Sequence, residues 1–343
     1  MNHEHDQIHR PRSTVKKFSV LSLALASTLS LALAGCSSAA GPDEAATDES
    51  GEYPLTIMNC GKEVILAAPP ERVVLLDSSP VTFLHLLDVM DRVVARAGTY
   101  PSEYYDADTQ AEIDRIPLLT DKLDTSGHLQ ISQEVVMAQE PDLVLGTAEG
   151  MNRETLAASG IPLLEEPSFC PDPPSDADFA DIGDQMETYA RAFGMEERGI
   201  ELAQELDDRV QEISLSVPEG EKRTAAVLYP TVGGGVTYAY GTGSMAHPQL
   251  EAAGFTNVFA DEDQRVFEVS REELIGRDPD VLILLHSAGD PTEISSAITS
   301  LRGAQSITAV ANDDVMVQLF NFTEPASPLS ILGLEHIIER FEQ

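Results

Sequence analysis

The sequence predicts an α/β protein of two similar lobes, each with a central, mainly parallel sheet, joined by one long rigid helix. The first observation is a repeat: residues 132–145 read SQEVVMAQEPDLVL, and residues 270–283 read SREELIGRDPDVLI. Each copy indicates a short helix, a Pro turn and an aliphatic strand, because proline cannot continue a helix. Aliphatic runs are typical of parallel strands buried on both faces. The spacing suits two lobes better than a solenoid, and chance similarity of two helix–strand units is the alternative.

The second observation is the longest uninterrupted helical pattern of the chain, at 196–217. Its apolar residues recur at a spacing of three to four and form one stripe: Ile200, Ala203, Leu206, Val210, Ile213 and Val217. A helix of this length spans roughly 30 Å. We therefore expect a strut between the lobes, preceded by a helix at 176–193. The predicted division is an N-terminal lobe at 53–175, connecting helices at 176–217 and a C-terminal lobe at 218–343.

Each lobe alternates strand and helix signals along the chain, which is typical of a parallel α/β sheet. In the first lobe we expect a hairpin (55–57 and 63–66), strand 72–76, helix 81–90, strand 93–95, an aromatic loop (100–105), the first repeat copy, helix 153–159 and strand 161–164. In the second we expect strand 223–229, a Gly-rich loop (232–236), a hairpin near 238–241, helix 247–253, strand 257–259, the second copy, helix 294–301, strand 315–319 and helix 329–341.

The N-terminal segment has the features of an export signal. Basic residues at 10–17 precede an apolar stretch at 18–33, which is too short and too interrupted for a good membrane span. The stretch ends in Leu33-Ala34-Gly35-Cys36, which looks like a bacterial lipobox with Cys36 as the lipid-bearing residue; a secretory signal with a chance cysteine is the alternative. Residues 1–35 are thus the predicted signal peptide, and 36–52, small, polar and acidic, a disordered tether.

Composition limits the partners. The 343 residues contain 58 Asp and Glu against 21 Lys and Arg, a formal net charge of −37. Such a surface repels nucleic acid and anionic lipid. Three cysteines are too few for a disulfide-built fold. Beyond Cys36, Cys60 and Cys170 fall in predicted loops of an exported lobe, so a disulfide is the simplest expectation, and two free thiols are the alternative. The bond closes a loop of roughly 110 residues, about 4–5 kcal/mol in the chain-entropy model.

An ordered set of motifs carries a resemblance to a known family. The set comprises Pro70-Glu71-Arg72-Val73-Val74, residues 86–94 (LLDVMDRVV), both repeat copies and residues 250–258 (LEAAGFTNV). With the lipobox and the long helix, the chain resembles the substrate-binding lipoproteins of ABC importers with a helical backbone, which carry ferric siderophores, heme and cobalamin. The resemblance covers roughly residues 53–343. It implies a ligand in a shallow cleft between two lobes that move little.

The resemblance also implies roles for particular residues. One glutamate on each lobe docks into arginine pockets of the permease; the matching positions here are Glu134 and Glu251. The cleft of such a fold is lined by loops at the carboxyl ends of strands. Aromatic and charged side chains gather there, which suits a large, partly apolar ligand. The expected ligand-binding residues are Arg96, Tyr100, Tyr104, Tyr229, Tyr240, Arg265, His286 and Phe322.

Other chemistry is weakly supported. Residues 241–246 (GTGSMA), with Asp261, match a dinucleotide fingerprint, but without a clear strand-to-helix turn. The mature histidines lack paired metal-ligand spacing, although capture of a free metal ion and axial heme ligation stay open. No nucleophile beside a base can be assembled.

The sequence therefore predicts a receptor rather than an enzyme. We expect an exported monomer, lipid-anchored to the outer face of the cytoplasmic membrane, that binds an iron chelate, foremost a ferric siderophore, and delivers it to an ABC permease and its ATPase. No cofactor and no metal site are expected. Cobalamin, heme or a free metal ion are the alternatives within the class. An exported α/β enzyme and a metal-sensing or adhesion lipoprotein are the alternatives outside it.

Overall fold

The computed structural model describes residues 53–343 except 125–126, 219, 221, 234 and 342–343. The predicted signal peptide, the tether and Cys36 lie outside the described residues. The N-terminal lobe contains β1 Leu55–Asn59, β2 Lys62–Leu66, β3 Val73–Leu75, α1 Pro80–Leu86, β4 Val93–Arg96, α2 Ala107–Ile113, α3 Gln133–Met137, β5 Leu143–Leu145, α4 Arg153–Ala158 and β6 Leu163–Leu164. Its sheet has the order β4-β3-β5-β6 with all neighbours parallel, and β1 and β2 form a separate antiparallel hairpin.

The connecting segment consists of α5 Ala180–Ala192 and α6 Glu196–Ser216. The C-terminal lobe contains β7 Thr224–Pro230, β8 Thr237–Tyr240, α7 Ala246–Ala252, β9 Thr256–Asn257, β10 Val266–Val269, α8 Arg271–Arg277, β11 Val281–His286, α9 Pro291–Thr299, α10 Thr308–Asn312, β12 Val315–Leu319 and α11 Pro328–Phe341. Its sheet runs β10-β8-β7-β11-β12, with β9 paired to β7. Strands β7, β9, β11 and β12 are parallel, whereas β8 runs antiparallel to both of its neighbours, β7 and β10.

The two repeat copies form the same structure in both lobes: α3 leads to β5, and α8 leads to β11. Glu140 and Asp278, just before the two prolines, both take the left-handed conformation, with φ of 50° and 45°. Asp142 accepts hydrogen bonds from the backbone N–H groups of Glu71 and Arg72, both at 2.8 Å. Its counterpart Asp280 accepts from the N–H of Thr224 at 2.8 Å. In each lobe the aspartate of the Pro-Asp pair therefore holds the starts of two parallel strands together, β3 and β5 in the first lobe and β7 and β11 in the second.

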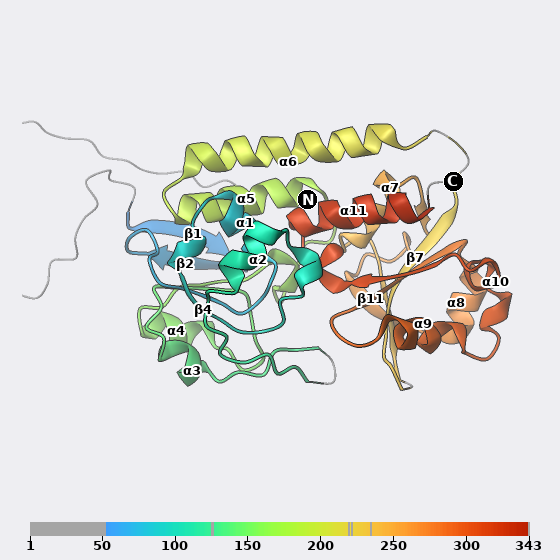
Figure 1. Ribbon diagram of the computed structural model, residues 1–343, viewed down its shortest axis with the longest axis horizontal. Helices are drawn as coiled ribbons and strands as arrows, with labels where there is room; N and C mark the ends of the chain where they lie inside the picture. Colours follow the sequence, from blue (N-terminus) through green and yellow to red (C-terminus); the bar gives the residue numbers. More distant parts are fainter. Residues whose placement is uncertain (1–52, 125–126, 219, 221, 234, 342–343) are drawn as a thin grey trace, which may run out of the picture. The chain divides into compact units, whose positions relative to one another are not determined.

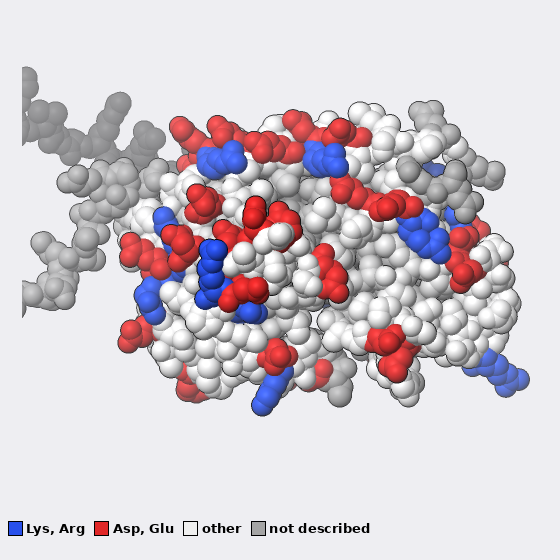
Figure 2. All heavy atoms as spheres, viewed as in Figure 1, with Lys and Arg blue, Asp and Glu red and all other residues white. Residues whose placement is uncertain are grey.

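Helix α6 runs above α5 and α11, as Figure 1 shows. Its close approach to α5 depends on Gly199, because a Cβ there would lie 2.3 Å from the Cβ of Ala190. An ion pair between Arg209 and Glu335 links it to α11. The predicted stripe is wrong at Ile200, which is 52% exposed, while Leu202 is buried. The outer face carries many carboxylates, which Figure 2 shows along this helix.

The core of the described residues consists of three large hydrophobic clusters and a small one formed by Tyr104, Phe322 and Leu329. One hydrophobic cluster extends across both lobes and the connecting helices, and includes Leu75, Tyr189, Leu202, Val227 and Leu334. A second fills the other face of the C-terminal sheet, and a third the other face of the N-terminal sheet. Because the lobes share one core, large independent movements would expose apolar surface and are disfavoured.

Candidate functional site: a cleft between the two sheets

A cleft of about 910 Å³ lies where the carboxyl ends of parallel strands from both lobes meet. Its lining residues lie at and after the end of β4 and on the neighbouring segment 118–121 in the first lobe, and at the end of β11, along and after β12 and on α11 in the second. They are Arg96, Gly98, Thr99, Tyr100, Pro101, Glu103, Leu118, Asp121, His286, Ser287, Ala288, Gly289, Pro291, Met316, Val317, Gln318, Leu319, Phe322 and His336. The carboxyl ends of strands are where open α/β sheets bind ligands, because the connecting loops diverge there.

Arg96 and Tyr100 form the first-lobe wall together. The guanidinium carbon of Arg96 lies 4.8 Å from the centre of the Tyr100 ring, a cation–π arrangement. Arg96 Nε also donates to the carbonyl of Ile116 at 3.3 Å. The Tyr100 hydroxyl donates toward the carbonyls of Asp77 and Ala97, both at 3.1 Å. Both side chains are half-buried, so they offer a fixed cation and a flat aromatic surface to a ligand.

His286 and Phe322 form part of the second-lobe wall. His286 ends β11, and its Nδ1 is buried without a hydrogen-bond partner in the described part of the chain. Phe322 packs edge-on against His336 of α11, with ring centres 4.6 Å apart. Four of the expected ligand residues, Arg96, Tyr100, His286 and Phe322, therefore line the cleft.

Tyr104 and Tyr240 were expected to contact ligand, but they do not line the cleft and are buried, at 4% and 3% exposure. The hydroxyl of Tyr104 accepts a hydrogen bond from the backbone N–H of Asn321 at 2.9 Å. Its ring packs on Phe322 at 5.0 Å. Tyr104 thus fastens the first lobe to the second. Tyr240 lies in the core beside Arg265 and Glu324, because the inward face of β8 carries it there.

Arg265 and Tyr229 also lie outside the lining. Arg265 faces Glu324, with Nη1 and Oε2 3.7 Å apart, and its guanidinium carbon lies 5.2 Å from the ring centre of Phe169 in the first lobe. Burial raises the pKa of Glu324, and the nearby Arg265 opposes this. Tyr229 supports the cleft from behind, since its hydroxyl bonds to Ser287 Oγ at 3.3 Å. Arg265 and Tyr229 therefore do not line the cleft but contact residues that support its walls.

Several lining residues escaped the sequence prediction. Leu118 and Asp121 lie on a segment that runs beside β4, where Arg96 N–H donates to Pro117 at 2.9 Å and Leu119 N–H donates to Arg96 at 2.8 Å. This pairing crosses a long loop without a periodic pattern, so only the tertiary structure shows it. His336 comes from α11, whose helical pattern gave no sign that it faces a cleft. Glu103 lies within the predicted aromatic loop, but nothing in the sequence distinguishes it from the many other acids of the chain as a candidate ligand residue.

The predicted docking acids are both exposed and belong to different lobes. Glu134 lies in the first turn of α3, where bonds from its own backbone N–H and from Ser132 lower its pKa. Glu251 lies near the end of α7, and its side chain is 59% exposed. In the part of the chain that is described, no helix has the length and apolar character needed to cross a membrane, and no cluster of three metal-ligating side chains occurs.

The model of a known protein family, described as periplasmic binding protein, matches residues 73–318. The chain belongs to this family. A solved structure of an ABC-type Fe3+-hydroxamate transport system from Saccharomonospora viridis is 54% identical in sequence, with a TM-score of 0.80, over 85% of this chain and 100% of that one. A cobalamin-binding protein of Halobacterium salinarum is 25% identical over 86% of this chain and 76% of its own length.

An uncharacterized ABC transporter substrate-binding lipoprotein of Bacillus subtilis, YvrC, is 22% identical over 90% of this chain and 92% of its own length. Family membership and the two-sheet fold confirm the sequence-based assignment to the substrate-binding proteins of ABC importers. This periplasmic binding protein therefore acts outside the cytoplasm as a carrier of a small molecule and not as an enzyme.

Proposed function

We propose that this periplasmic binding protein captures a ferric siderophore of the hydroxamate type in the cleft between its lobes and delivers it to an ABC permease. The observation that carries the proposal is the 54% identity to the Saccharomonospora viridis protein over the whole of that chain. The cleft supports it, since about 910 Å³ lined by an aromatic ring, a guanidinium and aliphatic side chains suits a bulky chelate with polar iron-binding groups.

Arg96 is the proposed contact to the chelate oxygens. A guanidinium donates several hydrogen bonds in one plane, and its stacking on Tyr100 orients it before ligand arrives. Tyr100 then provides a flat apolar contact for the ligand backbone. His286 and Phe322 close the opposite side.

A panel of ligands tests the proposal. The purified protein is titrated by isothermal calorimetry with a ferric trihydroxamate, a ferric catecholate, heme and cobalamin. We expect the trihydroxamate to bind, and Arg96→Ala to weaken it by about tenfold or more, because a hydrogen bond to a charged group is lost. Arg198→Ala, a change on the exposed face of α6, should leave binding unchanged.

Cobalamin is the second candidate, favoured by the similarity to the Halobacterium salinarum protein. Binding of cobalamin and not of the trihydroxamate would replace the first proposal by the second. Absence of binding to all four compounds would overturn both.

Two further proposals concern location and delivery. Cys36 carries the lipid that anchors the mature chain to the outer face of the cytoplasmic membrane. Treatment with globomycin, which blocks lipoprotein signal cleavage, should then cause the uncleaved precursor to accumulate, and Cys36→Ala should abolish labelling of the protein with a fatty acid.

Docking to the permease involves Glu134 and one acid of the second lobe. Gln133, in the first turn of α3, accepts a hydrogen bond from the N–H of Asn152, which follows the carboxyl end of β5, so this turn lies toward the edge of the sheet that holds the cleft. In the second lobe the equivalent position is Glu272, in the first turn of α8. Glu251 lies in the last turn of α7, which leads into β9, and therefore near the opposite edge. We therefore propose Glu272, in place of the expected Glu251, as the partner of Glu134, and the equivalent positions of Glu134 and Glu272 in the repeat support this.

A further inference from the structure

The charged side chains of the cleft are unevenly distributed between its two walls. Among the lining residues that the structure describes, the first lobe contributes one cation, Arg96, and two carboxylates, Glu103 and Asp121. The second lobe contributes only neutral side chains and the two imidazoles of His286 and His336. With neutral imidazoles, the lining therefore has a surplus of one negative charge.

Neither carboxylate is neutralised by a neighbour. Glu103 bonds to the hydroxyl of Ser102 at 3.3 Å, and no ion pair of Glu103 or Asp121 occurs within the described part of the chain. Lys122, next to Asp121, is exposed and does not line the cleft. Both acids are exposed, so two carboxylates without ion pairs on one cleft wall are available to a ligand.

Both carboxylates are held on fixed backbone. Glu103 lies in the short 3-10 turn Ser102–Tyr104, which Tyr104 fastens to Asn321 of the second lobe. Asp121 follows the segment paired with β4, where the N–H of Gly98 donates to the carbonyl of Thr120 at 2.8 Å. A fixed charge loses little entropy when it meets a ligand, so it contributes more to selectivity than one on a mobile loop.

The opposite wall indicates that the ligand body lies between the lobes. His286 is 7% exposed, and its buried Nδ1 has no hydrogen-bond partner among the described residues. An unpaired buried polar atom is costly, so a partner outside the described chain, such as a water or a bound molecule, is expected beside this residue of the cleft wall. A chelate held between Arg96 and His286 would share the cavity with Glu103 and Asp121, which line it as well.

We infer that Glu103 and Asp121 are specificity-determining residues that select ferric complexes with a protonated amine over neutral and anionic ones. This rests on the proposed function. Ferric iron held by three hydroxamates, each of charge −1, is neutral, so one peripheral ammonium makes the complex cationic. Ferric tris-catecholates and heme with ionised propionates are anionic, and the two carboxylates repel them.

The test uses three linear ferric trihydroxamates that share one iron-binding backbone and differ at one end: a free amine, its N-acetyl form and its N-succinyl form. Affinities are measured by calorimetry at pH 7.4 in low and moderate salt. We expect the affinity to decrease from the amine to the N-acetyl to the N-succinyl complex, by about fivefold at each step at low salt. The differences in affinity should become smaller in moderate salt, because salt screens the charges.

Variants test whether Glu103 and Asp121 cause the preference for the amine complex. Glu103→Gln and Asp121→Asn should each weaken the amine complex by about threefold to fivefold and leave the acetyl complex within twofold; together they should remove the preference. Glu63→Gln, an exposed acid of the β1–β2 hairpin, is the matched control and should change nothing.

The outcomes separate this inference from the proposed function. Equal affinities for the three complexes, or a preference that survives in the double variant, would overturn the role of the two carboxylates while the proposed function stands. If none of the three complexes binds, the proposed function fails and the inference fails with it.

Discussion

Glu166 is a carboxyl group buried in the first lobe, away from the cleft lining. It is 1% exposed, and its Oε1 accepts a hydrogen bond from the Tyr189 hydroxyl at 2.7 Å and a longer one from Ser79 at 3.4 Å. Its Oε2 has no partner in the described part of the chain. Burial raises the pKa of Glu166 to about 8, and the nearby Asp77 adds to this. The protonated acid is therefore the form that the fold favours.

This environment predicts a pH-dependent stability. Because the folded-state pKa lies above the unfolded value, the folded chain binds the proton more tightly, and the free energy of unfolding falls as pH rises from about 4.5 to about 8. The loss has an upper limit of about 5 kcal/mol. Glu166→Gln, which is neutral at every pH, should flatten this part of the profile. Urea unfolding of the wild-type protein and of Glu166→Gln at pH 5, 6.5 and 8 measures the free energy of unfolding. The same pH dependence of this free energy in both proteins would contradict the assignment to Glu166.

At the scale of single residues, sequence reasoning succeeded where a residue follows a strand directly and failed where its neighbours are remote. Arg96 and His286 end β4 and β11, so strand prediction alone placed them at the cleft edge. Tyr104 and Arg265 also fall in loops near strands. Their roles depend on Asn321 and Phe169, which are distant in the sequence, so composition could not distinguish a ligand contact from a contact between lobes.

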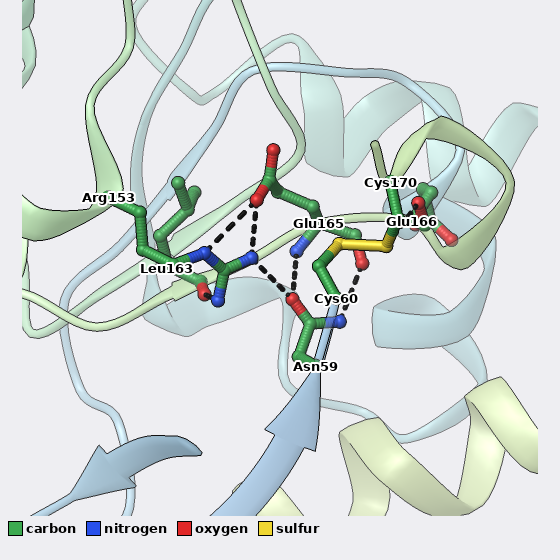
Figure 3. Close-up of a disulfide and its surroundings, with 7 residues drawn as sticks. All are labelled: Asn59, Cys60, Arg153, Leu163, Glu165, Glu166 and Cys170. Atoms are coloured by element: carbon green, nitrogen blue, oxygen red, sulfur yellow. Dashed lines mark hydrogen bonds and ion pairs between the residues drawn. A yellow bond between two sulfur atoms is a disulfide. The ribbon is translucent and has the colours of Figure 1, made fainter. Parts of the chain in front are cut away.

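Among the elements, the β1–β2 hairpin shows how a small sheet is fixed to its lobe. Cys60 in its turn forms a disulfide with Cys170, which follows β6. Figure 3 shows the adjacent polar network: Asn59 accepts from Arg153 at 2.7 Å and from the N–H of Glu165 at 2.9 Å. The bond and the network together fasten the hairpin to the edge of the parallel sheet.

Removal of the disulfide should lower the free energy of unfolding without disrupting the structure of the cleft. The Cys60→Ser, Cys170→Ser double variant frees a loop with a sequence separation of 110, for which about 2–5 kcal/mol is expected. Differential scanning calorimetry should show a Tm lower by roughly 5–15 °C. The wild-type protein in reductant should approach the Tm of the variant. An unchanged Tm would show that the hydrogen bonds alone hold the hairpin.

The elements with strong periodic signals were predicted closely. Helix α6 and strand β12 have nearly the expected bounds, and both repeat copies fold as helix, turn and strand. The helix expected at 81–90 is shorter, because Asp88 takes a positive φ of 57° and ends it. Strand β10 was not anticipated; its partner β8 makes it an edge strand, and its four residues give too short a pattern.

On the scale of the whole molecule, the shared core and the contacts between lobes favour recognition of the protein by its permease as one rigid unit. Exposed carboxylates that meet arginines across an interface contribute orientation and association rate more than affinity. Glu134 and Glu272 occupy equivalent positions of the repeat on the two lobes. With such a pair, each lobe contributes one carboxylate to the proposed interface with the permease.

Charge reversal tests this arrangement. Glu134→Lys and Glu272→Lys should each reduce uptake of the ferric complex by at least tenfold in cells and leave its affinity for the purified protein unchanged. Glu251→Lys serves as the comparison and should retain uptake. Loss of uptake in Glu251→Lys with uptake preserved in Glu272→Lys would restore the assignment made from the sequence. Preserved uptake in Glu134→Lys would remove the docking role altogether.

The sequence by itself determined the fold class, the long α6, the repeat in both lobes and the family, because these depend on local periodicity, on proline and on motifs close together in the chain. It also indicated Arg96, Tyr100, His286 and Phe322, which line the cleft, as candidate ligand residues. The tertiary structure decided which aromatic residues face the cleft, that Arg265 pairs with Glu324, and that Glu103 and Asp121 line one wall. These depend on contacts between distant segments, whose pairing follows from the packing of two sheets around one core.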